Sequence, residues 1–399
     1  MVYLLTLIVL CLFIYLFDLN KGSQKTAKLC FNLFTVWLIL LSGFAYQVGA
    51  DIPGYMQEYD TFGIKKIESF SDLFGFKDNR QPLWVLLEYI CHSISSNFFV
   101  FKLVIAIIGN WAFCRFIYKH SDYPFVTLLF YCLIVYLNLN FNALRQFMAI
   151  AFFLMGYDAM AEKKWVKYYA FCLCALLFHS TAIICFVLPL FHIIPINKKS
   201  VIIISSALLA SVFFILQFDM IDYVYDIVLN NADLMTEEYA DLAESYLEGA
   251  DSAESTIIGM IFIALQVFVV VFILYVNLKR HGEDQPLMLK MLFVYMFFII
   301  LNRAIPIVFT RFMQYFDIFY CCLLPSAVIP FCRRITKLNL VPIFAIAILA
   351  FLPINTLLSE NKQSGRPLIV QYDPYYSIFN PKIDPQRSML FGSYRGNSR

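Results

Sequence analysis

Long apolar stretches alternate with short polar connections along most of this 399-residue chain. A helix that crosses a bilayer needs about 20 mainly apolar residues. The stretches with this character are residues 2–17, 28–46, 98–118, 124–140, 141–160, 201–218, 256–277, 287–309, 312–332 and 338–357. The pattern predicts an all-α polytopic membrane protein with about 10–12 transmembrane helices once shorter segments are included.

Two further apolar stretches do not have the length of a simple span. Residues 82–96 are too short to cross comfortably, and residues 165–195 are too long for one helix but too short for two. We expect 82–96 to enter and leave by the same face, and 165–195 to form a helical hairpin with its apex near His179 and Ser180. Such segments occur where protein buries them or where they line a wet cavity. A polar cavity that opens outward is therefore expected.

Basic residues indicate the sidedness, because cytoplasmic loops collect Lys and Arg. On the expected topology the inside clusters are Lys21/Lys25/Lys28, Arg115/Lys119, Lys163/Lys164/Lys167, Lys198/Lys199, Lys279/Arg280 and Arg333/Arg334/Lys337. The N-terminus then lies outside, together with the loops 47–81 and 219–255, the second of which is acidic and has no Lys or Arg. Residues 1–357 are expected to form one membrane domain, and the polar tail 358–399 is also placed outside.

Composition supports a membrane protein and narrows its chemistry. Hydrophobic residues make up 61% of the chain and charged residues 15%, against roughly 45–50% and 25% in soluble domains. The net charge of +2 gives no reason to expect nucleic acid as a partner. The cysteines form no metal-site spacing, and the chain has no P-loop, HExxH, GxSxG or dinucleotide-binding motif. We expect no metal ion and no cofactor.

Ionisable side chains at membrane depth are costly, so each is a candidate site residue. The main candidates are Arg145, His179, Arg303 and Arg311, with Glu88, His92 and Lys102 as weaker members. Structural roles remain open for all of them: a snorkelling arginine, a core histidine, or an arginine that anchors a helix end. Several arginines around one outer cavity favour a phosphate ligand, because the guanidinium fork matches phosphate oxygens.

A set of short motifs resembles the EpsG family of Wzy-like exopolysaccharide polymerases. The motifs are Asn142-Ala-Leu-Arg145-Gln146-Phe-Met-Ala149, the basic turn Lys163-Lys164, Phe178-His179-Ser180-Thr-Ala182, and Thr310-Arg311-Phe312-x-x-Tyr315-Phe316. Asp51 stands where that family carries an early acid in an outer loop. The chain departs from the family pattern at Arg80-Gln81-Pro82, where an acidic residue often precedes the proline.

The resemblance implies a multi-pass protein of the bacterial cytoplasmic membrane with an architecture similar to the GT-C glycosyltransferases. It implies transfer of a growing glycan from undecaprenyl diphosphate to a lipid-linked repeat unit at the outer face, in the biosynthesis of exopolysaccharide, capsule or O-antigen. Implied partners are the lipid-linked oligosaccharide, membrane lipid, and proteins such as a flippase or a chain-length regulator.

This reaction suggests roles for particular residues. Arg145, Arg311 and Arg303 are expected to bind the diphosphate and stabilise its charge as it leaves. His179 is the first candidate for the general base, with Asp51 or Asp60 as the alternative. Candidates for substrate binding are Gln146, Gln314, Tyr315, Tyr55, Tyr59 and Arg80.

Other functions stay open at this point. A flippase or transporter of lipid-linked sugar also needs a basic cavity, although the chain shows no paired broken helices in corresponding halves. A ligase or another GT-C glycosyltransferase with a polyprenyl donor shares the same chemistry. A membrane acyltransferase, with His179 as its catalytic histidine, and a membrane protein without catalysis are further alternatives.

Overall fold

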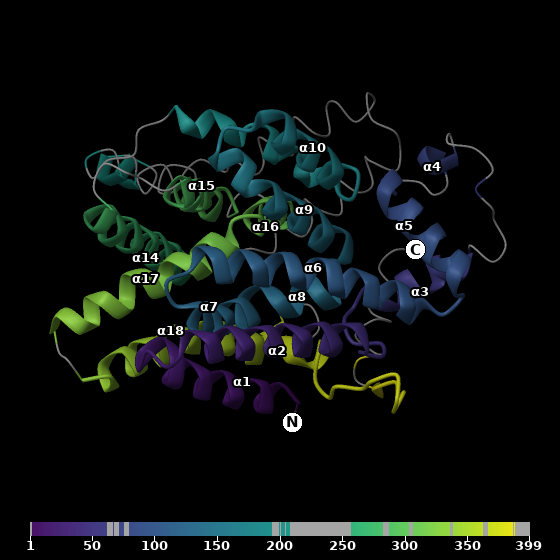
Figure 1. Ribbon diagram of the computed structural model, residues 1–399, viewed down its shortest axis with the longest axis horizontal. Helices are drawn as coiled ribbons and strands as arrows, with labels where there is room; N and C mark the ends of the chain where they lie inside the picture. The colour runs from purple at the N-terminus through teal and green to yellow at the C-terminus, as the bar shows by residue number, and fades with distance from the viewer. Residues whose placement is uncertain are drawn as a thin grey trace. The chain divides into compact units, whose positions relative to one another are not determined.

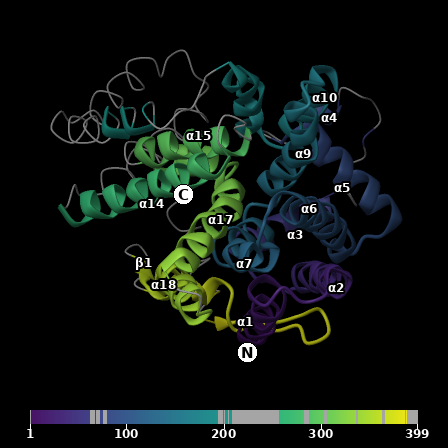
Figure 2. The same cartoon turned by 60° about the vertical axis from the view of Figure 1, so that its left-hand side comes forward.

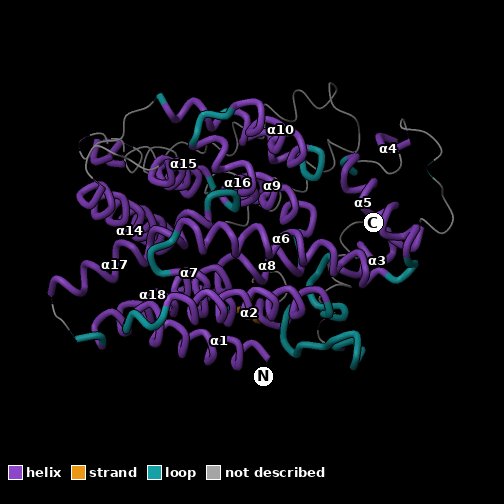
Figure 3. Tube along the Cα trace, in the orientation of Figure 1, coloured by secondary structure: helices purple, strands orange, loops and turns teal. Residues whose placement is uncertain are grey.

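The described part of the chain is almost entirely helical (Figures 1 and 3). The structure is a computed structural model, and it describes residues 2–61, 67, 72–75, 80–193, 199, 201–203, 205–207, 257–281, 287–302, 306–335, 338–361, 366–385 and 387. Within these ranges seven helices are long and apolar enough to cross a membrane. The prediction of an all-α polytopic membrane protein is therefore confirmed.

The chain divides into two compact units. The first unit is Met1–Val187 with Cys332–Arg399, and the second is Leu188–Phe331. The first unit contains α1 (Val2–Phe13), η1 (Ile14–Leu19), α2 (Gln24–Gly43), α3 (Ile52–Asp60), α4 (Asp72–Gly75), α5 (Pro82–Ile94), α6 (Phe98–His120), α7 (Pro124–Phe130), η3 (Tyr131–Tyr136), α8 (Leu137–Phe141), α9 (Leu144–Ala161), α10 (Trp165–Leu176), η4 (Ser180–Phe186), α18 (Leu340–Leu358), β1 (Glu360–Asn361), β2 (Arg366–Pro367) and η7 (Leu368–Gln371). The second unit contains η5 (Leu188–His192), α14 (Ile257–His281), α15 (Leu287–Leu301), α16 (Pro306–Met313) and most of α17 (Asp317–Ile335).

Helix α6 lies at the centre of the first unit, between α2 and α9, and α10 packs on the other side of α9 (Figure 2). Glycines allow the close approach of these helices. A Cβ atom at Gly109 would lie 2.1 Å from the Phe147 ring, and one at Gly156 would lie 2.8 Å from Phe171 Cβ. Small residues at helix contacts are typical of membrane proteins, because packing rather than the hydrophobic effect holds such helices together.

The ends of these helices that carry basic residues meet at one end of the first unit. Asp158 on α9 forms ion pairs with Lys119 at 2.6 Å, His120 at 3.0 Å and Arg115 at 3.9 Å, all on α6. Arg333 donates a hydrogen bond to the Leu19 carbonyl at 2.8 Å. We call this the basic end, and the sidedness expected from the sequence for these clusters stays a prediction.

Helix α7 also begins at the basic end, and another helix supplies its cap. Pro124 occupies the first helical position, where its missing N–H costs nothing. The Val126 N–H donates to Asp18 Oδ2, in the last turn of the first span, at 2.8 Å. A carboxylate at a helix N-terminus satisfies a free N–H and also interacts favourably with the helix dipole.

The two unusual apolar stretches form short elements, as expected. Helix α5 has 13 residues, which extend about 20 Å, less than the hydrocarbon thickness of about 30 Å. The 165–195 stretch turns after α10 at His179 and continues as the 3₁₀ helix η4. Tyr168 near the start of α10 donates to the Cys185 carbonyl near the end of η4 at 2.6 Å, so these two elements form a hairpin.

Some boundaries differ from the expected ones. The stretch 287–309 was expected as one helix, but α15 ends at Leu301 and a new helix, α16, begins with Pro306. Proline cannot donate the helical hydrogen bond and disfavours the helical conformation of the residue before it, which explains the separate start. The next helix begins at Asp317 rather than at residue 312. Most of the expected span 201–218 and the whole acidic loop 219–255 lie outside the described residues.

Candidate functional site

The start of α5 brings together three segments of the first unit. Pro82 is the first residue of the helix, and Gln81 before it has an extended backbone, as the residue before a proline prefers. The Leu83 N–H donates to the Leu177 carbonyl at 3.0 Å, which ties α5 to the turn of the α10–η4 hairpin. Arg80 and Gln81 reach side chains on α3 and α9. These contacts define the candidate site.

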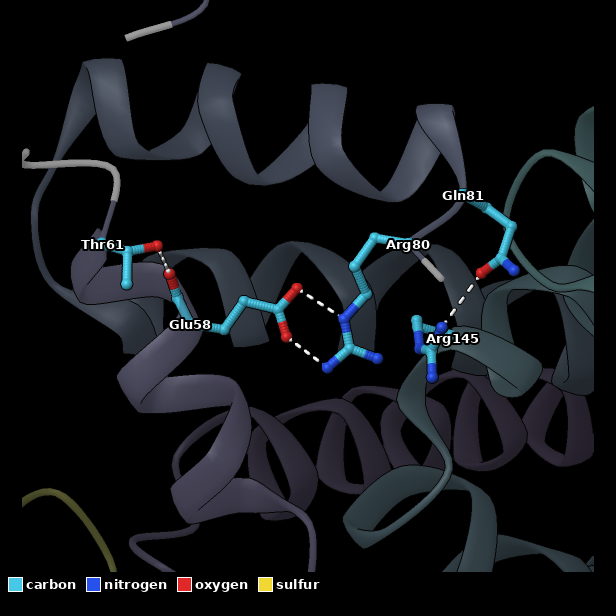
Figure 4. A network of polar contacts seen from close by, with 5 residues as sticks. All are labelled: Glu58, Thr61, Arg80, Gln81 and Arg145. Atoms are coloured by element: carbon cyan, nitrogen blue, oxygen red, sulfur yellow. Dashed lines mark hydrogen bonds and ion pairs between the residues drawn. The ribbon is translucent and has the colours of Figure 1, made fainter. Parts of the chain in front are cut away.

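Arg80 forms a two-point ion pair with Glu58 on α3 (Figure 4). Its Nε and Nη2 atoms donate to Glu58 Oε1 and Oε2 at 2.8 and 2.6 Å. The Glu58 side chain is 3% exposed and that of Arg80 25%. The guanidinium also lies 6.0 Å from the centre of the Tyr55 ring. Charge-assisted bonds of this bidentate kind fix geometry as well as contributing energy, so the pair holds α3 against the start of α5.

Arg145 lies in the first turn of α9 and reaches the same place. Its Nη1 donates to Gln81 Oε1 at 3.0 Å (Figure 4). Gln81 is an uncharged partner, and this hydrogen bond orients the guanidinium. A helix N-terminus already carries partial positive charge. A guanidinium placed there raises the local positive potential, and an anion bound at this position would be stabilised by both.

The phenol of Tyr55 is buried, and the charged groups of the site act on its pKa. Burial raises the pKa of this phenol, and the charge of Asp51 raises it further. The charge of Arg145, a hydrogen bond with Arg145 and the charge of Arg80 lower this pKa. Four of the residues singled out in the sequence, Asp51, Tyr55, Arg80 and Arg145, therefore interact electrostatically in one cluster. We call these four residues with Glu58 and Gln81 the arginine cluster.

His179 caps η4 with its own side chain. Its Nδ1 accepts a hydrogen bond from the Thr181 N–H at 3.3 Å and lies 2.8 Å from Thr181 Oγ1. A backbone N–H can only donate, so Nδ1 is an acceptor here and the neutral ring carries its proton on Nε2. In this state His179 presents a donor rather than a base at Nε2. Its catalytic role stays a prediction.

The remaining predicted residues of the first unit have different surroundings. Tyr59 is fully buried, donates to the Ser95 carbonyl at 2.7 Å and stacks on Phe101, so it belongs to the core. Asp60, at the end of α3, is exposed. Gln146 is buried beside Arg145 with 2% exposure.

Arg311, Gln314 and Tyr315 belong to the second unit. Arg311 is in the last turn of α16, and Tyr315, in the turn that follows, is fully buried. Thr310 donates to Asn302 Oδ1 at 2.7 Å and so links the two ends of the break between α15 and α16. Arg303 lies outside the described residues. The expected convergence of these residues with Arg145 and His179 stays a prediction, since the two groups belong to different units.

A comparison with protein families identifies the chain. The model of the EpsG family matches residues 28–375. The chain belongs to the EpsG family. No curated protein and no solved structure matches it.

Membership of the EpsG family indicates a polymerase related to exopolysaccharide biosynthesis, and in general terms a glycosyltransferase of the membrane. With its long apolar helices the EpsG chain is a multi-pass membrane protein. The family match includes the arginine cluster and His179 but begins after the first span. The likeness to GT-C enzymes stays a prediction.

Two members of the arginine cluster were absent from the residues proposed on sequence grounds. Glu58 was one of several acids in the loop 47–81, and its position three residues after Tyr55 on one helix face was the available signal. Gln81 offered no signal beyond its place before Pro82. Its role depends on the approach of α9 to α5, which is a tertiary contact.

Proposed function

We propose that this EpsG-family chain elongates a polysaccharide held on undecaprenyl diphosphate at the outer face of the bacterial cytoplasmic membrane. A sugar hydroxyl of the incoming lipid-linked repeat unit attacks the anomeric carbon of the growing glycan. The bond from that carbon to the diphosphate oxygen breaks, the hydroxyl proton passes to a base, and undecaprenyl diphosphate leaves. The family match supports the reaction class, and the arginine cluster supplies the residues.

Arg145 is the observation on which this proposal depends most. It places a guanidinium in the first turn of α9, and its hydrogen bond to Gln81 directs that group. Arg80, by contrast, donates from both Nε and Nη2 to the Glu58 carboxylate. We therefore assign the leaving diphosphate to Arg145 and a positioning role to Arg80. Fixed cations at a developing anion lower the barrier because they need no reorganisation during the reaction.

The proton of the attacking hydroxyl needs an acceptor in the same cluster. Asp51 directly precedes α3, and the N–H of the neighbouring Ala50 donates at 2.6 Å to Asn142, three residues before Arg145. A carboxylate therefore belongs to the same part of the first unit as the proposed diphosphate site. Nδ1 of His179 is occupied by Thr181. We assign the base to Asp51, and to His179 a hydrogen bond from Nε2–H to the substrate. A positioned base contributes about 10²–10⁴-fold to such reactions.

The test is elongation by purified protein in liposomes supplied with a lipid-linked oligosaccharide. Wild-type protein should produce a ladder of longer glycans. Arg145→Ala, Asp51→Asn and His179→Ala should remove the long products while the protein still inserts. Arg334→Ala is the matched control, because Arg334 is exposed at the basic end, and it should elongate as the wild type does.

Two results would contradict the proposal. One is a normal ladder from Arg145→Ala, which would remove the assigned diphosphate residue. The other is movement of the oligosaccharide across the bilayer without any joining of units, which would identify a flippase instead.

A further inference from the structure

The C-terminal segment, residues 366–385 with Arg387, lies along the loop 44–50 that leads into the arginine cluster. The Tyr46 N–H donates to the Tyr376 carbonyl at 2.8 Å, and the Ile378 N–H donates to the Phe44 carbonyl at 2.9 Å. Further along, the Gly49 N–H donates to the Gln371 carbonyl at 3.1 Å. A run of backbone bonds in both directions, like the edge of a small sheet, fixes the loop along most of its length.

Arg387 holds this arrangement together from inside the segment. It is 2% exposed, and its guanidinium donates to the carbonyls of Gln47 at 3.0 Å, Pro374 at 2.7 Å and Val370 at 3.3 Å. One side chain thus joins the loop 44–50 to two places in the segment. A buried guanidinium that donates to three carbonyls is costly to disturb, because each carbonyl it leaves would be desolvated without a partner.

Asn142 connects the same segment to the chain just before Arg145. Its Oδ1 accepts from the Ala50 N–H at 2.6 Å. Its Nδ2 donates to Tyr372 Oη at 2.8 Å and to Gln371 Oε1 at 3.2 Å. Ala50 immediately precedes Asp51, and Asn142 comes three residues before Arg145. The Asn142 side chain therefore links the backbone next to Asp51, the proposed base, with the start of α9, which carries Arg145.

The phenol of Tyr372 belongs to the same arrangement, and the residue is 5% exposed. Burial raises the pKa of its phenol, the hydrogen bond from Asn142 opposes the rise, and the charge of Asp51 adds to it. The phenol oxygen accepts from Asn142, so Tyr372 helps to fix the amide that also accepts from the Ala50 N–H.

The loop also has no room to shift on its other side. Gly49 has φ of +101°, and a Cβ atom there would lie 1.8 Å from the Phe141 carbonyl oxygen. Lys102 on α6 donates to the Ala45 carbonyl at 2.8 Å. The loop 44–50 is thus held between the C-terminal segment and the ends of α6 and α8.

We propose that the C-terminal segment is a working part of the active site: Tyr372 and Asn142 are positioning residues for Asp51 and Arg145, and Arg387 anchors the segment that carries Tyr372. This inference rests on the proposed function. It assigns to the polar tail a role in catalysis that neither its composition nor its place at the end of the chain indicates.

The test compares Tyr372→Phe, Arg387→Ala and Lys382→Ala in the liposome elongation assay, with kcat and KM measured separately. Lys382 lies in the same segment and is exposed, so its variant is the matched control. Tyr372→Phe removes one oxygen atom and should lower kcat about 10-fold, with KM and the melting temperature close to those of the wild type. Arg387→Ala should lower kcat further and speed hydrogen exchange at the Tyr46 and Gly49 amides.

The outcomes separate this inference from the function on which it rests. If wild-type protein elongates and both Tyr372→Phe and Arg387→Ala match Lys382→Ala in kcat and exchange, the role of the segment is wrong while the polymerase assignment stands. If wild-type protein does not elongate at all, the proposed function fails first and this inference with it. Should Arg387→Ala not fold, Tyr372→Phe alone decides, because its fold is little perturbed.

Discussion

The two ends of the first unit hold their charges in different ways. At the basic end one carboxylate, Asp158, with a 25% exposed side chain, faces Lys119 and Arg115, whose side chains are 50% and 48% exposed. In the arginine cluster the Glu58 side chain is 3% exposed and accepts hydrogen bonds from Nε and Nη2 of Arg80. The first arrangement leaves its two long cations about half exposed, whereas the second buries the carboxylate and leaves its arginine 25% exposed.

On the proposed function, this difference separates charges that orient the protein from charges that act on its substrate. Exposed cations at a membrane boundary contribute to sidedness and cost little. Withdrawing a carboxylate and a guanidinium from water costs several kcal/mol per ion unless the geometry is nearly ideal. In the arginine cluster the two-point pair of Arg80 with Glu58 offsets that cost, and Gln81 directs Arg145. Such an arrangement is expected of a ligand-binding site. Four substitutions test the contrast, from the largest expected effect to the smallest.

Glu58→Gln should have the largest effect, on stability. It leaves Arg80 without its countercharge in a largely buried position, and breaking such a pair costs about 3 kcal/mol or more. A lower melting temperature in detergent, measured beside wild type, is the expected result. The charge-reversed double variant Glu58→Arg/Arg80→Glu should recover part of the loss; a melting temperature unchanged in Glu58→Gln would show that the pair is not buried in practice.

Arg145→Lys should retain the charge and still lose elongation by about 100-fold, since a point charge does not reproduce the fork that matches a diphosphate. The same change at Arg115 on the basic end should alter the rate less than about 2-fold. Initial rates in liposomes measure both. Equal losses at the two positions would remove the distinction between the two ends.

Gln81→Ala should lower kcat about 10-fold, because Arg145 keeps its charge but loses the acceptor that directs it. Binding of the lipid-linked donor should change little, so kcat and KM are measured separately. A rise in KM with kcat unchanged would show that Gln81 contacts the substrate instead of orienting Arg145.

Asp158→Asn should have the smallest effect. Its partners Lys119 and Arg115 are half exposed, and exposed pairs contribute about 1 kcal/mol or less. His120 is 19% exposed but is charged only when it is protonated. The melting temperature should fall slightly and the elongation rate should not change. A large loss of elongation would indicate that the basic end takes part in the reaction.

The helices of the first unit follow from the sequence because a span needs one unbroken apolar stretch, and such stretches are visible in residue order. The break before Pro306 was missed because apolar residues continue on both sides of it. The exact start of a helix depends on caps and tertiary contacts, as the cap from Asp18 to Val126 shows.

Arg145 could be found from the sequence because a charge within an apolar stretch is conspicuous, and Asp51 because the family resemblance pointed to it. Tyr372 and Arg387 could not be found in this way. Their contacts are mostly with backbone carbonyls and one amide, and the sequence does not display which carbonyls lie nearby. A polar tail gives no sign that it docks.

The cap from Asp18 has a consequence for how much of the chain is needed. The family match begins at residue 28, after the first span, yet α7 within the matched region takes its first-turn acceptor from Asp18. A chain shortened to the matched residues loses the first span and the first four residues of α2, and it leaves the Val126 N–H without its acceptor. The first span therefore contributes to the start of α7 and is more than a separable membrane anchor. An insertion between the two has to keep the Asp18 carboxylate at the N-terminus of α7.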